Sequence, residues 1–290
     1  MRISNRSDKP IIISDKDTIT GLNIVNMKRI LVIRLDEIGD VVLSTPFLRE
    51  LRRNCPKAWI TLIVKPECYA LVETCPYINE VRLFNRNTIY SVVGALSKIK
   101  NQLSILLFCL FSIRGRKFDL VILPRWDWDL YYATRIVKLI RARIKIAFSE
   151  YVNEYKQKLN ARFDRCFSHV IDDRSVKHEV EHNLEVIRCI GGRVEADGLE
   201  LWITDEDRKF AELVLQQQCI GEGALLIASS PGASEAKRVW PKERYAEIYK
   251  WLIDDMGARL ILFGCVSEKN LSEYFMSELW PGRQGKFLIL

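Results

Sequence analysis

The sequence predicts an α/β protein with two Rossmann-like units, each a parallel sheet covered by helices. Short, apolar, β-branched runs alternate with longer stretches of helical periodicity along most of the chain. The apolar runs are nearly continuous, as in strands that are buried on both faces. The alternation pauses over 150–177 and restarts near 195. Because strands separated by helices favour crossover connections, both units are expected to contain parallel sheets.

The first unit is expected over 27–194. Its strands are predicted at 29–35, 58–66, 78–84, 118–124 and 144–149, and its helices at 44–56, 88–113, 127–142 and 178–192. Ser44 or Thr45 suits the cap of the helix at 44–56, and Pro46 suits its first turn. The polar stretch 150–177 has weak periodicity and predicts a long loop.

The two ends of the chain are expected to differ: the first is a disordered extension and the second is part of a folded domain. The first 26 residues are polar apart from "PIII" and contain no continuous apolar run like that of a signal peptide, so we expect a disordered extension. The second unit is expected over 195–290 as a partial domain. After the apolar run 198–204 it should contain a helix at 205–218, a strand at 223–232, a helix at 241–257 and a strand at 258–264. The final "FLIL" resembles the beginning of another strand.

Composition narrows the class of protein only moderately. The formal net charge is +7, which fits either a solvated basic face or attraction to an anionic substrate or membrane surface. The eight cysteines form no CxxC pair and only three histidines are present, which indicates reduced thiols in a cytosolic protein and argues against a zinc site. His178 and His182 lie one helical turn apart, and we interpret them as helix packing or surface residues.

The stretch "RLDEIGD" (34–40) follows the first predicted strand and contains two carboxylates, Asp36 and Asp40. With a single glycine it lacks both GxGxxG and the GxxxxGK[ST] phosphate loop. Ligands of such sheets still bind beyond the carboxyl ends of the strands, where this turn should lie. For either aspartate alone, capping of the next helix is the simpler interpretation.

Two later motifs indicate an anion site. In "SSPGASEAKRVWPKERYAEI" (229–248), Ser234, Lys237 and Arg238 stand before a helix that begins at Trp240-Pro241. The alternative is a solvated loop with Trp240 as a packing anchor. In "LFGCVSEKN" (262–270), Glu268 follows a strand, where it can bind ribose hydroxyls or act as an N-terminal helix charge.

Taken together, these motifs resemble glycosyltransferase family 9, the heptosyltransferases of the lipopolysaccharide core, over about residues 27–270. The resemblance implies a GT-B architecture, an inverting reaction and a nucleotide-sugar donor such as ADP-heptose. It matches Asp40 to the catalytic base and leaves Asp36 as a turn or cap residue. Ser234, Lys237 and Arg238 match donor-phosphate positions, and Glu268 matches the position near the ribose. Neither a cofactor nor a metal is implied.

The resemblance also implies a cytoplasmic enzyme acting on lipopolysaccharide or a related lipid-linked glycan, with no nucleic-acid partner. The basic stretch 131–145 and the apolar run 103–113 fit peripheral contact with the inner membrane, or a solvated face and a core helix. The DxGxxH-type segment of the family is absent before Leu290. A truncated, non-catalytic remnant or a glycan- or nucleotide-binding module is therefore the alternative.

Overall fold

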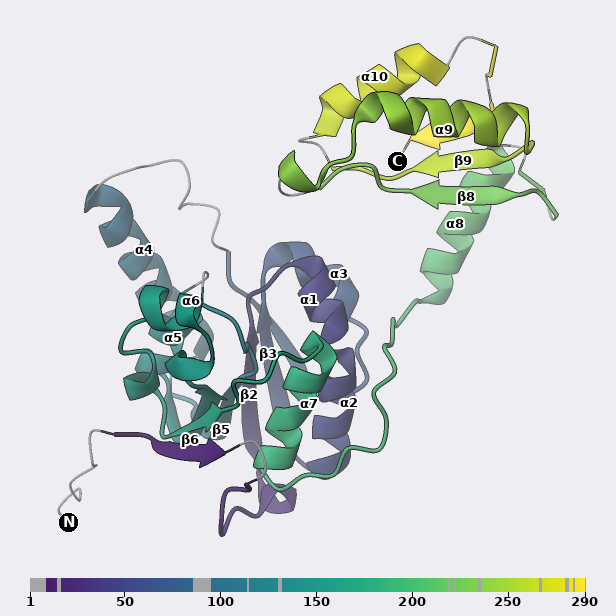
Figure 1. The fold of residues 1–290 in the computed structure, drawn as a ribbon. Coiled ribbons are helices and arrows are strands. Elements are labelled where there is room, and N and C mark those ends of the chain that lie inside the picture. The colour runs from purple at the N-terminus through teal and green to yellow at the C-terminus, as the bar shows by residue number, and fades with distance from the viewer. Residues whose placement is uncertain are drawn as a thin grey trace, which may run out of the picture. The chain divides into compact units, whose positions relative to one another are not determined.

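The computed structural model describes residues 9–14, 17–85, 95–113, 115–129, 132–218, 220–221, 223–233, 236–265, 268–279, 282–283 and 285–289. The chain divides into two compact units, Met1–Trp202 and Ile203–Leu290 (Figure 1). The division falls after Trp202, later than the boundary at 194 expected from the sequence.

The first unit is built on a seven-stranded sheet with the order β1-β7-β6-β5-β2-β3-β4. Every pairing in it is parallel. The strands are β1 (Ile11–Ser14), β2 (Arg29–Arg34), β3 (Trp59–Val64), β4 (Glu80–Leu83), β5 (Lys117–Leu123), β6 (Arg141–Phe148) and β7 (His169–Asp172). The central strand β2 has five buried residues in succession, as its unbroken apolar run predicted.

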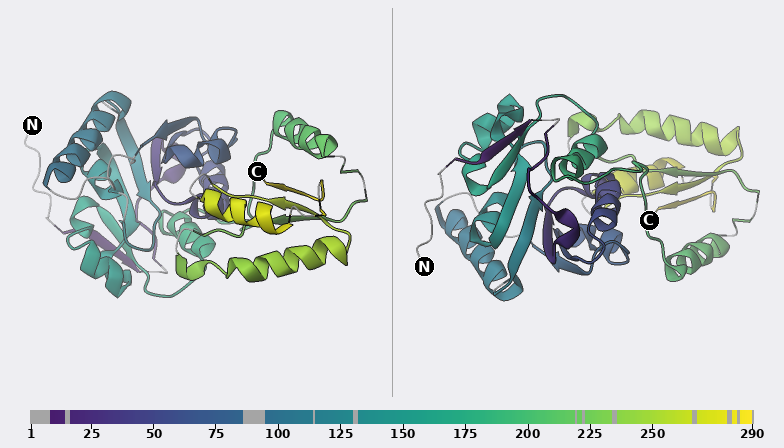
Figure 2. Two further views of the ribbon diagram at one scale, coloured as in Figure 1. Left: turned by 90° about the horizontal axis from the view of Figure 1, so that it is seen from above. Right: turned by 90° about the horizontal axis from the view of Figure 1, so that it is seen from below.

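Helices cover both faces of this sheet (Figure 1 and Figure 2). They are α1 (Ile38–Leu43), α2 (Thr45–Asn54), α3 (Tyr69–Val72), α4 (Ala95–Phe108), α5 (Ala133–Leu139), α6 (Glu154–Leu159) and α7 (Glu179–Cys189), and α4 continues into a π-helical turn, Cys109–Ile113. One core contains Leu51 of α2 and Val186 of α7. The other contains Ile105 of α4 and Ile136 of α5.

Three local expectations for the first unit were wrong. Residues 11–14 form β1, which pairs with β7 instead of belonging to a disordered extension. The expected loop at 150–177 contains α6 and β7. The helix expected over 127–142 is limited to α5, and β6 begins already at Arg141. Of these elements only β1 lies at an edge of the sheet, where a short and mostly exposed strand has a weak local pattern.

The second unit contains a smaller parallel sheet with the order β10-β9-β8. Its elements are α8 (Asp205–Gln217), β8 (Leu226–Ser229), α9 (Lys242–Asp254), β9 (Arg259–Leu262), α10 (Lys269–Leu279) and β10 (Phe287–Ile289). Helices α9 and α10 lie on one face of the sheet (Figure 1 and Figure 2), where Ile253 and Phe275 are buried. The terminal "FLI" pairs with β9, as a strand should.

The apolar run 198–204, where the second unit was expected to begin, is not a strand. Its first part lies along the first unit. Arg49 of α2 donates hydrogen bonds to the carbonyl oxygens of Ala196 and Gly198 at 2.8 and 2.9 Å. The hydroxyl of Thr74 donates to the carbonyl of Trp202 at 2.7 Å. These bonds explain why the first unit extends to Trp202.

Within the described parts of the chain, no helix is long and apolar enough to cross a bilayer.

Candidate functional site

The candidate site of the first unit lies at the carboxyl end of β2. Arg34 is the last residue of this strand, and Asp40 stands in the first turn of α1. Ligands of open parallel sheets bind beyond this edge. The backbone therefore places Asp40 where the sequence motif predicted it.

Arg34 is 1% exposed and connects three segments that meet at this edge. Its Nε lies 3.0 Å from Asp36 Oδ2, and its Nη2 lies 2.5 Å from Glu179 Oε1 at the start of α7. The same Nη2 donates to the backbone carbonyl oxygen of Asp40 at 3.3 Å. Because a guanidinium donates in a rigid plane, the two hydrogen bonds of Nη2 fix the turn between β2 and α1.

Asp36 is not a cap or simple turn residue, contrary to the sequence interpretation. It is 2% exposed and forms ion pairs with both Arg34 and Arg125. The N-cap of α1 is Glu37, whose own side chain makes no capping hydrogen bond. A buried carboxylate needs compensating charge, and two guanidinium groups supply it here. Asp36 therefore holds the two arginines in place.

Asp40 is half-buried. Burial raises the pKa of its carboxyl group, and the nearby charge of Glu179 raises it further, although Arg34 acts in the opposite direction. A carboxylate with a raised pKa is a better proton acceptor than an exposed aspartate. Asp40 therefore has the partly desolvated environment that a general base requires.

The sequence interpretation missed Arg34, Arg125 and Glu179. Arg34 and Arg125 each stand at or just after the end of an apolar strand, and β2 pairs directly with β5. A cation at the end of a buried strand was the signal that could have identified them, since parallel neighbours bring their carboxyl ends together. Glu179 reaches this edge only because α7 begins beside it, which no local pattern shows.

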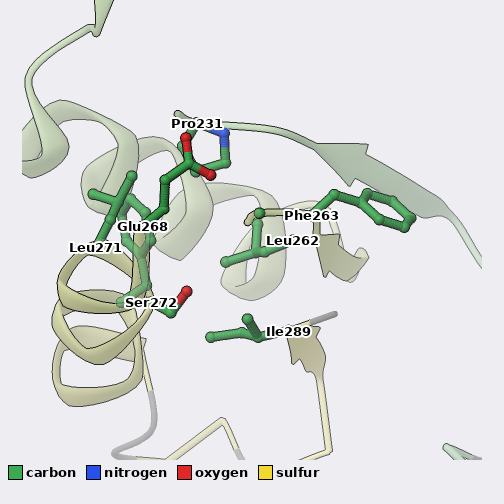
Figure 3. Close-up of a pocket in the computed structure, with 9 residues that line it drawn as sticks. Pro231, Leu262, Phe263, Glu268, Leu271, Ser272 and Ile289 are labelled. Atoms are coloured by element: carbon green, nitrogen blue, oxygen red, sulfur yellow. The ribbon is translucent and has the colours of Figure 1, made fainter. Parts of the chain in front are cut away.

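The second unit places Glu268 at the start of α10, against the end of β8. Its Oε2 accepts a hydrogen bond from the backbone N–H of Cys265 at 2.9 Å. A Cβ atom at Gly232 would lie only 1.7 Å from Glu268 Oε1, so the absence of a side chain at Gly232 makes room for the carboxylate. Figure 3 shows the carboxylate directed toward Pro231. The loop after β8 and the start of α10 are thus fitted to each other.

The space beside Glu268 is small and mostly apolar. It has a volume of about 10 Å³ and is lined by Leu262, Leu271, Phe275 and Ile289 among others (Figure 3). That volume is about enough for one water molecule. No basic side chain contributes to its described lining.

The expected anion-binding residues are only partly described. Lys237 and Arg238 lie exposed in a 3-10 turn, Ala236–Arg238, before α9, whereas Ser234 lies outside the described residues. Trp240 packs edge-on against Tyr245, with ring centroids 5.0 Å apart, so it is a packing anchor as well as the entry to the helix. The structure does not bring Lys237 and Arg238 into the hollow beside Glu268.

Of the two histidines, His178 caps α7 and His182 is buried within it. His178 Nδ1 accepts from the N–H of Val180 at 3.4 Å at the start of the helix. His182 is 2% exposed and stacks on Trp126 with ring centroids 4.6 Å apart. Burial lowers the pKa of His182. Among the described residues no group of three or more His, Cys, Asp or Glu side chains is arranged to hold a metal ion.

Comparison with known proteins confirms the family resemblance. No family model matches the chain. The chain is similar to lipopolysaccharide heptosyltransferase 3 of Escherichia coli, with 21% identity over 221 residues, which is 76% of this chain and 58% of the relative. For the protein of that name from Escherichia coli strain K12, the identity is 24% over 216 residues, which is 72% of this chain and 56% of the relative. The chain therefore spans a little over half the length of these curated relatives.

Solved structures confirm the fold. A glycosyl transferase of family 9 from Veillonella parvula has a TM-score of 0.69 at 21% identity, with 92% of this chain and 70% of the other covered. E. coli heptosyltransferase WaaC with ADP-2-deoxy-2-fluoro heptose has a TM-score of 0.60 at 15% identity, with 90% and 76% covered. E. coli ADP-heptose lps heptosyltransferase II has a TM-score of 0.60 at 18% identity, with 90% and 72% covered. The GT-B-like class with two parallel-sheet units is thus the fold of this chain.

Proposed function

We propose that the protein is a glycosyltransferase that transfers a heptose-like sugar from a nucleotide-sugar, ADP-heptose, to the lipopolysaccharide core or a related surface glycan. The observation that carries this proposal is the half-buried Asp40 with a raised pKa at the carboxyl end of β2. Its setting in a GT-B-like fold and the similarity to heptosyltransferases support the assignment.

In the proposed reaction, Asp40 accepts the proton of the acceptor hydroxyl as that oxygen attacks the anomeric carbon from the face opposite the diphosphate. The configuration at the anomeric carbon is therefore inverted. Arg34 positions the base through its hydrogen bond to the Asp40 carbonyl oxygen. The nucleoside diphosphate leaves with the electron pair of the broken bond, and cations stabilise it.

The second unit supplies the proposed donor-binding groups. Lys237 and Arg238, with Ser234, are assigned to the diphosphate, and Glu268 is assigned to the ribose. The assignment of Glu268 to the ribose rests on its position. It lies beside the segments that follow β8 and β9, Pro231-Gly232 and Phe263-Gly264, and nucleotides bind at this edge in such folds. The proposal involves no metal or other cofactor and places the reaction in the cytoplasm, at the inner face of the membrane that carries the acceptor.

A second candidate function is a non-catalytic glycan- or nucleotide-binding module. The small hollow beside Glu268 is the observation that keeps it open: about 10 Å³ is far below the several hundred Å³ of an ordinary ligand pocket, which argues against a complete donor site for turnover. The two candidates make different use of Asp40. A binding module has no need of a base, whereas a transferase loses its turnover without one.

The test combines transfer and binding. Wild-type protein and Asp40→Asn are incubated with ADP-heptose and heptose-deficient lipopolysaccharide, and transfer is measured by mass spectrometry. Calorimetry with ADP-sugars and UDP-sugars measures donor binding. We expect Asp40→Asn to lose transfer by roughly a hundredfold or more while donor binding is retained. Asp205→Asn is a matched control, because Asp205 also stands in the first turn of a helix but is exposed. Unchanged turnover in Asp40→Asn would refute the base assignment, and donor binding without transfer by wild-type protein would favour the binding module.

A further inference from the structure

Helix α4 and the π-helical turn that follows it expose a continuous apolar surface. Ile105 and Ile113 of this segment are buried in the core of the first unit. The exposed large apolar side chains of the same segment are Leu103, Leu106, Leu107, Leu110 and Phe111. Phe111 is 85% exposed. A large aromatic side chain that is exposed within an apolar patch often marks an interaction surface. We call these five residues, together with the basic residues Lys117, Arg141 and Arg143, the α4 surface.

A groove adjoins these side chains. It has a volume of about 420 Å³ and lies between the end of α4, the end of α5 and the first residues of β5 and β6. Leu106, Leu110 and Ile113 contribute apolar lining from one side, and Leu139 and Ile140 contribute it from the other. The groove is large enough to accept part of an acyl chain.

Basic side chains border the groove. Lys117 and Arg141 are paired neighbours on β5 and β6, and both line it. Arg143 lies two residues further along β6, so it projects from the same face of the sheet. All three are exposed. Arg116 also lines the groove, where it forms an ion pair with Glu80.

The charge around the groove is therefore positive. Glu80 is balanced by two cations, since it forms ion pairs with both Arg82 and Arg116. The stretch 131–145, which supplies Arg141 and Arg143, contains no acidic residue. This arrangement is complementary to a surface that is negatively charged at the headgroups and apolar beneath them.

We propose that the α4 surface docks onto an anionic lipid bilayer. Phe111 and the leucines enter the boundary between headgroups and acyl chains, while Lys117, Arg141 and Arg143 contact lipid phosphates. Helix α4 has 14 residues, and about 20 apolar residues are needed to span a bilayer, so it lies in the interface. Docking of this kind does not depend on the proposed transfer activity, but it brings an enzyme of that activity to a lipid-linked acceptor.

Vesicle co-sedimentation of the full chain tests the proposal. We expect binding to vesicles of phosphatidylcholine with phosphatidylglycerol, weaker binding at high salt, and little binding to phosphatidylcholine alone. Phe111→Ser should weaken the partition coefficient roughly tenfold or more. Lys117→Gln with Arg141→Gln should weaken binding to the anionic vesicles by roughly tenfold or more and leave binding to neutral vesicles unchanged.

Phe210→Ser is the matched aromatic control, because Phe210 of α8 is 65% exposed and lies in the other unit. It should bind vesicles like the wild type. Leu103→Ser is a second surface variant, and thermal unfolding by circular dichroism shows whether each variant is folded. The proposal is overturned if wild-type protein does not bind anionic vesicles, or if Phe111→Ser and Leu103→Ser bind as well as Phe210→Ser. It is also overturned if light scattering shows a dimer that Phe111→Ser converts to a monomer, since the surface then serves a second copy of the chain.

Discussion

Arg34 Nη2 lies 3.3 Å from the backbone carbonyl oxygen of Asp40 and 2.5 Å from Glu179 Oε1. One buried guanidinium thus connects the turn that carries Asp40 to Glu179, the first residue of α7, which lies 145 positions after Arg34. The position of the proposed base is therefore set by an ion pair between distant segments as well as by its own helix.

Arg34→Met should destabilise the protein by about 3–5 kcal/mol, because it leaves buried Asp36 with one cation fewer and removes the partner of Glu179. The free energy of unfolding in urea measures this change. Arg174→Met is the control, since Arg174 is exposed and its ion pair with Asp172 is screened by solvent, so its loss should hardly change stability. Similar losses in the two variants would contradict the role assigned to Arg34.

Asp40→Asn should change the pH dependence of stability. Burial raises the pKa of Asp40 above the value of 3.8 that applies to an unperturbed aspartate, so the folded state binds this proton more tightly than the unfolded state does. The wild-type carboxyl therefore contributes stability at acidic pH that is lost as the pH rises through its folded pKa. Because asparagine does not titrate, the variant should gain stability relative to wild type between acidic and neutral pH. The free energy of unfolding in urea, measured for both proteins across this range, tests the expectation. A difference between the two proteins that does not change with pH would contradict it.

Lys156→Met should change how stability depends on pH above neutrality. Lys156 is fully buried, and its Nζ donates to the carbonyl oxygens of Arg125, Trp126 and Phe148 at 3.0–3.1 Å. Burial lowers the pKa of Lys156 to about 7 from 10.5. A lowered folded pKa means that stability rises with pH between these two values, by at most about 1.4 kcal/mol per pH unit.

The free energy of unfolding of wild type should therefore increase relative to that of Lys156→Met between about pH 7 and 10.5. Lys158→Met, two residues further on and exposed, should show no such trend. A parallel pH dependence of wild type and Lys156→Met would show that Lys156 keeps an ordinary pKa.

Glu268→Gln should weaken the binding of ADP by roughly tenfold or more, because a hydrogen bond from a ribose hydroxyl to a carboxylate is stronger than one to an amide. The amide oxygen of glutamine can still accept from Cys265 N–H, so the turn before α10 is expected to persist. Glu273→Gln, in the helix α10 that follows and exposed, is the control. Equal ADP affinities by calorimetry would remove Glu268 from the proposed donor site.

Cys265 should react first with iodoacetamide among the described cysteines, because it is exposed. Cys55, Cys68 and Cys75 are buried, and burial raises the pKa of these thiols to about 11, 11 and 12. Their alkylation should be at least about tenfold slower, since the thiolate is the reactive form. Peptide mapping in a Cys219→Ser background identifies the labelled residue. Rapid labelling of Cys55 in folded protein would contradict the burial.

Local sequence patterns predicted the central strands well. The runs at 29–35, 58–66 and 118–124 became β2, β3 and β5 because a strand buried on both faces must be apolar throughout. The turn after β2 followed from the same pattern, whereas α1, which carries Asp40, was not expected, since the predicted helix began at 44. The edge strand β1 and its neighbour β7 did not follow, because each is only four residues long and they depend on pairing between distant parts of the chain.

The sequence by itself determined the α/β class, the order of the central strands and helices, and the motifs that resemble heptosyltransferases. All of these depend only on local periodicity and on the spacing of residues along the chain. Tertiary structure decided the surroundings of the candidate base. Asp36 became a buried partner of Arg34 and Arg125 because β2 and β5 lie side by side, and Arg34 met Glu179 because α7 begins at the same edge. Ion pairs between segments so far apart depend on how the chain is folded, and no single stretch of residues contains that information.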